Sequence, residues 1–411
     1  MNIPELLCPA GSMDALDAAL HFGADAVYGG MKRFGLRAFA GNFDEPSLRR
    51  AVQKTHEAGK KFYLTLNVFP FDDQMDAFVG AARLASVVGV DAAIVSDLGA
   101  IVTLRREVPG LPIHVSTQAN TVNAAAVRHY YDLGCTRVIL AREVGLERIR
   151  RMKAGLGNDM ELEVFAHGAA CMAYSGRCML SAALTGRSAN QGACAQPCRW
   201  AYAVTTERGT HAALPVAEDE NGTYLFSARD LNLMPILPEL VGTGISSLKI
   251  EGRMKTEFYV ATVVGAYRRA LDALAKGEDA FRAMLPALLD ELNSCSHRES
   301  DTGFMLGSPE APGGAEGFYQ TKEYVARAAE DAEPGEEAVF VLKNRFHTGD
   351  QLELMTAQGI RPLHAVDFLR EKTGETLSTL GIAGERIRMR VDTPVRAGDL
   401  VRGPVRNHRE A

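Results

Sequence analysis

The sequence predicts an α/β fold in which eight parallel strands alternate with helices and close into a barrel, followed by a small antiparallel β module. One local pattern recurs four times: a glycine, then one to three small or polar residues, then an apolar run. It reads FGADAVYGG (22–30), VGVDAAIVSD (88–97), LGCTRVILAR (133–142) and TGISSLKIEG (243–252). A glycine just past a helix adopts the left-handed conformation that ends it. The apolar run suits a strand buried on both faces of a parallel sheet, so each copy is expected to end a helix and begin a strand.

The number of such runs indicates a closed barrel. Amphipathic stretches such as SMDALDAALHFG and TVNAAAVRHYYDLG lie between most of them and read as helices. We expect strands near 4–9, 25–30, 61–67, 91–97, 112–118, 137–142, 161–167 and 245–251. Eight strand–helix units predict a (β/α)8 TIM-like barrel. An open doubly wound sheet is the alternative, and it is less favoured because no Gly-x-Gly-x-x-Gly turn follows any strand.

The spacing of the strands predicts a long insertion and a second domain. Strand seven begins near 161 and strand eight near 245, a gap of 84 residues that contains four of the seven cysteines. We therefore expect a barrel domain over 1–307, with a cysteine-rich insertion after strand seven at about 168–244 and a helical extension after Arg253. The Gly/Pro-rich stretch in 308–319 reads as a linker. Short strands and turns over 320–411 predict a small antiparallel β-barrel-like module.

Composition limits the class of protein. The chain has 411 residues, of which 46% are hydrophobic and 23% charged, as in ordinary globular proteins. The net charge of −6 supplies no electrostatic argument for nucleic-acid binding, since such domains are usually basic. The N-terminal MNIPELLCPAGSMDAL lacks a basic segment and a long apolar run, and no stretch approaches the ~18 apolar residues of a membrane span. We expect a cytoplasmic protein, in which cysteines stay reduced.

Four cysteines in the insertion predict a metal centre. Their spacing is Cys171-x6-Cys178-x15-Cys194-x3-Cys198, within glycine-rich text that allows the backbone to bend tightly. Four thiolates suit a structural zinc or an iron–sulfur cluster. Zinc sites usually show two tight pairs, whereas only Cys194 and Cys198 are close here, which favours a cluster. The alternative is inert buried thiols, the state that we expect for Cys8 and Cys135; we assign no role to Cys295.

Polar residues at predicted strand ends are candidates for the chemistry, because such residues point into one mouth of a closed barrel. They are Asn67, Asp97, Gln118, Arg142, Glu143, His167, Lys249, Glu251 and Arg253. Glu143, His167 and Glu251 are candidates for proton transfer, and Asn67, Gln118, Arg142, Lys249 and Arg253 for substrate binding. Arg142 and Arg253 can each bind a carboxylate with two hydrogen bonds. The alternative is that these charges form ion pairs that brace the mouth.

The sequence also resembles a known family. The segments EVFAHGAACMAYSGRCMLS (163–181), NQGACAQPCRW (190–200), FSARDLNLM (226–234), SLKIEGRMK (247–255) and SHRESDTGF (296–304) resemble the peptidase U32 family, the collagenase-like proteases. The resemblance spans essentially the whole chain. Within the family the chain looks most like the tRNA hydroxylation proteins, which make 5-hydroxyuridine at the wobble position of tRNA.

The resemblance implies a four-iron, four-sulfur (4Fe–4S) cluster, oxygen-independent hydroxylation of tRNA, and prephenate, a dicarboxylate, as the oxygen source. It also implies that a second U32-family subunit can take part. In some members a cluster ligand lies in the segment that matches SARDLNLM. This chain has Asn232 at that place, which makes Cys198 the expected fourth ligand.

Two other functions stay open. One is a U32-type peptidase, although the chain has no His-Glu-x-x-His helix and no Gly-x-Ser-x-Gly elbow. Cysteines that share a metal would also not be free as nucleophiles. The other is a metal-stabilised module that binds RNA or protein without turnover.

Overall fold

The computed structural model divides into two compact units. It describes residues 2–37, 40–157, 160–171, 173–176, 178–200, 217–219, 222–224, 229–307, 318–364, 366–377, 379–380 and 382–405. Unit 1 comprises Met1–Leu16, Asp25–Lys255 and Arg298–Phe318, and unit 2 comprises Asp17–Ala24, Thr256–His297 and Tyr319–Ala411. The predicted linker lies almost wholly outside the described residues.

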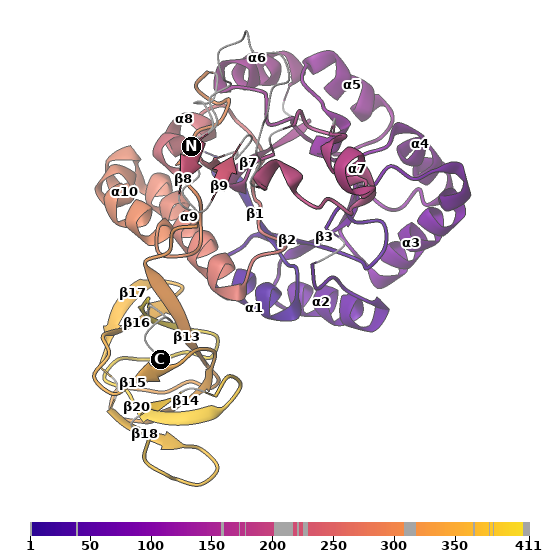
Figure 1. Cartoon of the computed structure of the whole chain (residues 1–411). Helices are drawn as coiled ribbons and strands as arrows, with labels where there is room; N and C mark the ends of the chain where they lie inside the picture. Colours follow the sequence, from indigo (N-terminus) through magenta and orange to yellow (C-terminus); the bar gives the residue numbers. More distant parts are fainter. Residues whose placement is uncertain are drawn as a thin grey trace. The chain divides into compact units, whose positions relative to one another are not determined.

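Unit 1 contains a closed barrel of eight parallel strands (Figure 1). The strands are β1 (Glu5–Pro9), β2 (Ala26–Gly30), β3 (Lys61–Leu66), β4 (Ala92–Val95), β5 (Ile113–Val115), β6 (Arg137–Ile139), β7 (Glu161–Ala169) and β11 (Ser247–Ile250). Each pairs with the next, and β11 pairs in parallel with both β7 and β1, which closes the sheet. The predicted barrel is confirmed, and the open sheet is excluded.

Helices alternate with these strands along the chain. They are α1 (Met13–His21), α2 (Glu45–Glu57), α3 (Met75–Val88), α4 (Leu98–Glu107), α5 (Ala124–Asp132), α6 (Leu146–Leu156) and α8 (Leu237–Val241). Figure 1 shows α2 to α6 in a ring outside the strands. The glycine of each recurring pattern, Gly23, Gly89, Gly134 and Gly244, has a positive φ between 77° and 101°. Glycine adopts this conformation without steric cost, which is why each copy ends a helix where the sequence predicts.

The strands are short but deeply buried. All the residues of β2, β4, β5, β6 and β11 are buried, because helices cover one face of the sheet and the barrel interior covers the other. The polar ends of the strands therefore gather at the two rims of the barrel. At one rim the chain leaves β7 into the cysteine-rich insertion.

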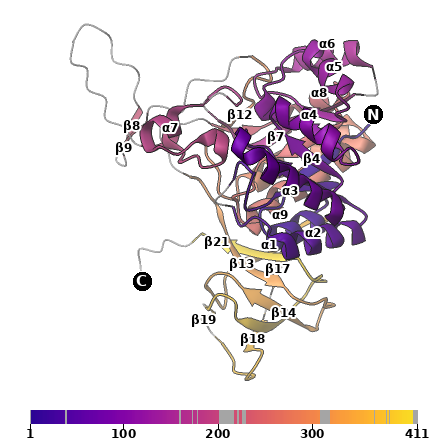
Figure 2. The ribbon, with the colours of Figure 1, turned by 90° about the vertical axis from the view of Figure 1, so that its right-hand side faces the viewer.

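The insertion contains short elements at one end of the barrel. They are α7 (Leu180–Thr185), the 3-10 turns η3 (Ala189–Gln191) and η4 (Pro197–Arg199), and the hairpin of β8 (Ala217–Asp219) and β9 (Gly222–Tyr224). Figure 2 shows α7 at the end of the barrel opposite the chain's N-terminus. The chain returns through β10 (Asp230–Asn232), which pairs antiparallel with β7 and also contacts β12 (Ser300–Asp301). The other 3-10 turns are η1 (Asp72–Gln74), η2 (Thr117–Ala119) and η5 (Met234–Ile236).

Unit 2 combines two helices with an antiparallel sheet. The helices are α9 (Glu257–Lys276) and α10 (Glu278–Leu292). The seven-stranded sheet has the order β17-β16-β21-β13-β14-β20-β18, and β15 pairs with β19. The strand bounds are β13 (Lys322–Ala328), β14 (Glu337–Leu342), β15 (Phe346–His347), β16 (Leu352–Thr356), β17 (Gly359–Leu363), β18 (Val366–Arg370), β19 (Thr379–Leu380), β20 (Arg386–Arg390) and β21 (Leu400–Pro404). The predicted small antiparallel module in the C-terminal region is confirmed, while its predicted bounds of 320–411 and the other domain boundaries stay a prediction.

Candidate active site at the barrel mouth

A cavity of about 350 Å³, called here the outer cavity, opens where three neighbouring barrel strands end. Its wall includes Arg142, three residues beyond β6; Cys171, two residues beyond β7; and Glu251, which directly follows β11. Strands β6 and β11 both pair with β7, so the three ends are adjacent. This is the face at which (β/α)8 enzymes build their active sites.

All four cysteines of the predicted centre line the outer cavity: Cys171, Cys178, Cys194 and Cys198. None of the four forms a disulfide with another described residue; Cys171 is exposed and the others are half-buried. The backbone N–H of Gln196 donates a hydrogen bond of 3.3 Å to Sγ of Cys194. Among the described residues, no three His, Cys, Asp or Glu side chains converge as metal ligands do. The four cysteines nevertheless line one cavity, and four thiolates are a donor set that suits an iron–sulfur cluster.

The loop between Cys171 and Cys178 is braced by Glu143. The Glu143 carboxylate accepts hydrogen bonds from the backbone N–H of Ser175 (2.8 Å) and from its hydroxyl (2.9 Å). In the same loop, a Cβ added to Gly176 would lie 2.2 Å from the carbonyl oxygen of Gln118, and its φ is +73°. Only glycine fits such a close approach. Glu143 therefore positions the cysteine loop, and both of its oxygens are engaged.

Glu251 has a partner that the sequence analysis missed. Arg37 binds its Oε1 through Nη2 at 3.2 Å, and both residues line the outer cavity. Burial alone would raise the pKa of Glu251, but the positive charges of Arg37, Arg142 and Arg253 outweigh burial and hold it below its usual value. Glu251 in turn raises the pKa of Arg37. The ionised carboxylate is therefore stable at neutral pH.

Tyr28 faces the same carboxylate. Its hydroxyl lies 2.9 Å from the carbonyl oxygen of Ile250 and 3.4 Å from Oε2 of Glu251. Burial, and then the negative charge of Glu251, raise the pKa of Tyr28 well above its usual value. The phenol therefore stays protonated beside Glu251, and the pair places a hydroxyl donor beside a carboxylate acceptor at the end of β11.

A second, inner cavity of about 50 Å³ lies deeper in the barrel mouth. It shares Arg37, Gln118, Arg142 and Glu251 with the outer cavity. Asn67, Lys249 and Arg253 line only the inner one of the two. The predicted substrate-binding residues therefore lie on the walls of two adjoining cavities.

Arg253 is held by neutral groups. It is 3% exposed and donates hydrogen bonds to Oγ1 of Thr65 (2.8 Å) and to Oδ1 of Asn42. Burial lowers its pKa to about 10. A Cβ at Gly30 would lie 2.2 Å from Nη2 of Arg253, so a side chain there would displace the guanidinium.

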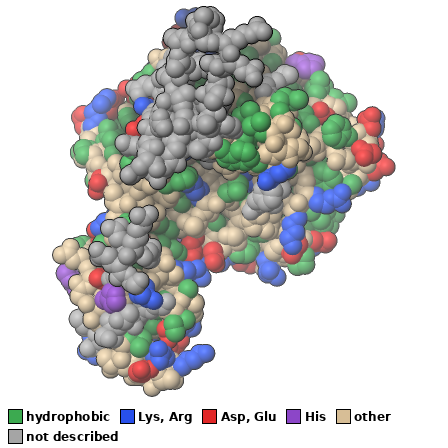
Figure 3. Space-filling model, viewed as in Figure 1, with side chains coloured by type: hydrophobic (Ala, Val, Ile, Leu, Met, Phe, Trp, Pro, Cys, Tyr) green, Lys and Arg blue, Asp and Glu red, His purple; other side chains and the backbone are tan. Residues whose placement is uncertain are grey.

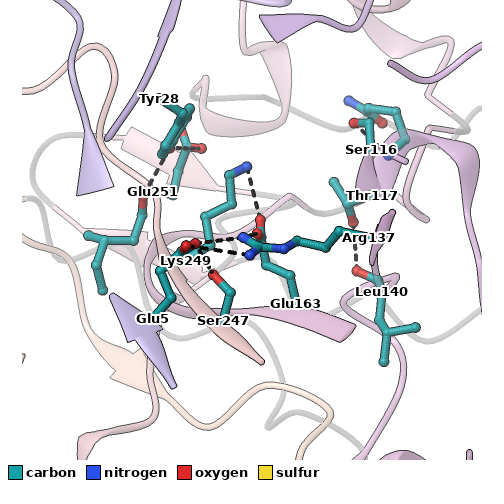
Figure 4. A network of polar contacts seen from close by, with 12 residues as sticks. Glu5, Tyr28, Ser116, Thr117, Arg137, Leu140, Glu163, Ser247, Lys249 and Glu251 are labelled. Carbon is teal, nitrogen blue, oxygen red and sulfur yellow. Dashed lines mark hydrogen bonds and ion pairs between the residues drawn. The ribbon is translucent and has the colours of Figure 1, made fainter. Parts of the chain in front are cut away.

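Lys249 takes part in a buried ion-pair network (Figure 4). Its Nζ lies 3.2 Å from Oε1 of Glu163. The other carboxylate oxygen of Glu163, Oε2, lies 3.1 Å from Nη1 of Arg137, and the same Nη1 lies 2.6 Å from Oε1 of Glu5. Nζ of Lys249 also lies 4.2 Å from the centroid of the Tyr28 ring. Burial lowers the pKa of Lys249, and the Glu163 carboxylate opposes this. The network links strands across the barrel interior, and the partners of Lys249 in it are not the strand-end charges Glu251 and Arg253 beside which the sequence places it.

Arg142 differs from the other basic residues at the mouth. Its guanidinium carbon lies 4.0 Å from the centroid of the Phe165 ring, in a cation–π contact. Within the described part of the chain its side chain has no hydrogen bond or ion pair. Arg142 therefore presents a guanidinium fork to both cavities.

The other predicted residues are placed as follows. Oδ1 of Asn67 accepts a hydrogen bond from the backbone N–H of Leu36 at 3.1 Å. His167 lies buried in β7, paired with Asn232 of β10, and lines neither cavity. Asp97 caps the N-terminus of α4 by accepting a hydrogen bond from Ala100 at 2.8 Å.

A buried ion pair between Asp230 and Arg298 also lines the outer cavity. Nε of Arg298 donates to Oδ1 of Asp230 at 3.2 Å. Both residues lie within the segments FSARDLNLM and SHRESDTGF that carry the family resemblance, which was the signal available for them. Arg37 had no such signal, since it follows no strand directly and its partner is 214 residues away.

Comparison with known proteins decides the family. The model of "Peptidase family U32" matches residues 11–314, and that of "Peptidase family U32 C-terminal domain" matches 320–402. The chain belongs to peptidase family U32. This confirms the resemblance seen in the sequence.

Several relatives extend the match over most of the chain. The "tRNA hydroxylation protein P1" of Bacillus subtilis (strain 168) is 35% identical over 402 residues, which cover 97% of this chain and 94% of that protein. The "tRNA hydroxylation protein P" of Escherichia coli (strain K12) is 35% identical and covers 87% of each chain. The "Collagenase" of Porphyromonas gingivalis (strain ATCC BAA-308 / W83) is 34% identical and covers 67% of each.

The part of this U32 protein that the structure describes contains no helix with the length and apolar character of a membrane span.

Proposed function

We propose that this protein is an RNA-hydroxylating enzyme that acts on tRNA, with a 4Fe–4S cluster at the barrel mouth. One observation carries the proposal: four thiols line the same cavity as the guanidinium of Arg142 and the carboxylate of Glu251. The similarity to two tRNA hydroxylation proteins over most of the chain supports the choice of substrate. The finer assignment is 5-hydroxyuridine at the wobble position.

Cys171, Cys178, Cys194 and Cys198 would hold the cluster. The donor set fits it, because four thiolates are the usual ligands of a 4Fe–4S centre. The backbone N–H of Gln196 that donates to Sγ of Cys194 also fits, since hydrogen bonds to sulfur tune the potential of such centres. When bound, the cluster supplies electron transfer.

The oxygen source is proposed to be prephenate. Arg142 presents a planar fork to one carboxylate, and the positive charges of Lys249 and Arg253 in the inner cavity favour the second. In the reaction, the uridine exchanges a C–H bond for C–OH and is oxidised by two electrons. The donor loses one oxygen atom and is reduced by two electrons, so atoms and electrons balance.

Glu251 and Tyr28 are proposed to move the proton at the reacting carbon. Glu251 is ionised because Arg37 and its basic neighbours hold its pKa low, and the Tyr28 hydroxyl beside it keeps its proton. Glu143 instead positions the cysteine loop.

The test is the nucleoside content of tRNA from a deletion strain. The full chain, supplied on a plasmid, should restore 5-hydroxyuridine as measured by mass spectrometry, and Cys178→Ala should abolish it. Cys295→Ala is the matched control, because Cys295 is buried and lines neither cavity. Unaltered tRNA in the deletion strain would exclude the function.

Peptidase activity is the second candidate, favoured by the name of the Porphyromonas gingivalis relative. Gelatin cleavage by the purified protein, lost on substitution of a residue of the outer cavity, would support it. Cleavage that survives such a substitution would come from a contaminant.

A further inference from the structure

The outer cavity carries exposed aromatic side chains that core packing does not require. Tyr174 is 51% and Phe318 62% exposed, and both line the cavity. Nζ of Lys255 lies 5.1 Å from the centroid of the Phe318 ring. Figure 3 shows hydrophobic side chains exposed beside basic ones on the face of unit 1 that carries α7. Apolar groups gathered at a cavity indicate a ligand site, and aromatic rings are the side chains on which unpaired bases of RNA stack.

The same cavity contains three carboxamide side chains: Gln118, Asn190 and Gln196. None of the three amides has a hydrogen-bond partner among the described residues. Each amide presents one acceptor and a donor group side by side. The edge of a nucleobase presents the complementary alternation of donors and acceptors.

Gln196 is held in a conformation that a side chain disfavours. Its φ of +56° and ψ of +43° are left-handed, and it precedes Pro197. Left-handed backbone costs energy for any residue with a Cβ, and glycine would avoid this cost. The presence of glutamine therefore points to a use for its amide, which lines the cavity.

We propose that the outer cavity is a nucleobase pocket, in which Tyr174 and Phe318 stack on an unpaired base of RNA and the Gln196 amide hydrogen-bonds its edge. The choice of RNA rests on the proposed function. Four basic residues of the cavity can contact the neighbouring phosphates, and two of them are ion-paired with the two carboxylates of the cavity. The basic residues are Arg37, Arg142, Lys255 and Arg298, and the carboxylates are those of Asp230 and Glu251.

The experiment measures RNA affinity of the full-length, anaerobically purified protein. The probes are fluorescein-labelled oligouridylate and tRNA from the deletion strain, followed by fluorescence anisotropy. Tyr174→Leu and Phe318→Leu should each raise Kd about tenfold or more, the scale of one base–aromatic stack. Gln196→Gly should raise Kd about two- to tenfold, the scale of one hydrogen bond. Tyr174→Phe keeps the ring and should recover most of the affinity lost in Tyr174→Leu.

Controls separate binding from folding. Asn120→Gly is matched to Gln196→Gly, since Asn120 also has a φ of +56° but lines neither cavity, and it should bind RNA as wild type does. Phe318→Leu lies outside the cysteine-rich insertion, so iron content should not change. Gln196 lies between Cys194 and Cys198, so iron content is measured in Gln196→Gly as well, and affinity that is lost while iron content is kept would come from the missing amide.

The outcomes are distinct. Wild-type affinity in Tyr174→Leu, Phe318→Leu and Gln196→Gly would overturn the pocket. A collagen peptide that displaces the RNA probe, and whose own binding is lost in the same variants, would also overturn it, in favour of a peptide site. If the variants lose RNA affinity while the wild-type protein restores no 5-hydroxyuridine, the pocket stands and the proposed function fails.

Discussion

Alanine at Arg142 and alanine at Arg253 should differ in their effect on stability, because Arg253 is hydrogen-bonded within the fold, whereas Arg142 makes only a cation–π contact among the described residues. The Arg142 guanidinium contacts the Phe165 ring and has no hydrogen bond or ion pair within the described residues. Arg253 is 3% exposed and bonded to Thr65 and Asn42. Arg142→Ala should therefore weaken donor binding, and Arg253→Ala should also destabilise unit 1.

The magnitudes follow from these contacts. Arg253→Ala removes two hydrogen bonds and leaves the buried oxygens of Thr65 and Asn42 without this donor. Each oxygen left without a donor costs about 1–3 kcal/mol, so the free energy of unfolding should fall by about 2–6 kcal/mol. Arg142→Ala loses one cation–π contact, about 0.5–2 kcal/mol. If Arg142 binds a donor carboxylate with two hydrogen bonds, its loss should weaken donor binding by about 2–5 kcal/mol. Arg142→Lys should recover only part of this, because an ammonium lacks the planar fork.

Two measurements check this pair. Calorimetry with prephenate gives the donor affinity of the anaerobic protein, and urea unfolding gives the stability, with iron content measured in both. Wild-type donor affinity in Arg142→Ala would refute the carboxylate role. If Arg142→Ala lowers stability as much as Arg253→Ala does, both residues brace the mouth and the reasoning from the contacts of Arg142 fails.

Three further predictions concern the cysteine loop and the cavity carboxylate. Protein purified anaerobically should be brown and contain about four irons per chain. Cys178→Ala should remove the colour, and Cys295→Ala should leave it. Colourless wild-type protein that contains one zinc would contradict the cluster. Glu143→Ala should release iron faster than Glu143→Gln, which keeps one acceptor for Ser175, and equal release rates would count against the brace. Because the folded-state pKa of Glu251 is lowered, its ionised form stabilises the fold above the ordinary carboxyl pKa of about 4.3. The stability gap between wild type and Glu251→Gln should therefore shrink as pH falls through and below that value, and a gap that widens in acid, measured by urea unfolding, would contradict this.

Much of the mouth was predictable from strand ends. Arg142, Gln118 and Glu251 are the last residues of predicted strands, and all three line the outer cavity. The four cysteines, chosen by spacing, line it as well. Parallel strands bring their carboxyl ends to one rim, so position along the chain translates into position in space. His167 shows the limit of this rule, because strand β7 continues past it to Ala169 and keeps it buried.

The barrel, its helix stops and the four cysteines at one cavity are predictable from the chain alone, because they depend on local patterns: a glycine before an apolar run, and closely spaced cysteines. Which charges meet is visible only in the folded protein. Arg37 pairs with Glu251 across 214 residues, and Arg298 with Asp230 across 68. Arg253 is buried against neutral groups, while Arg142 stays open to both cavities. The strength of a charge interaction depends on the distance between the two side chains and on their burial. Both are set by the closed barrel, which brings these side chains together, and neither can be read from a local pattern in the chain.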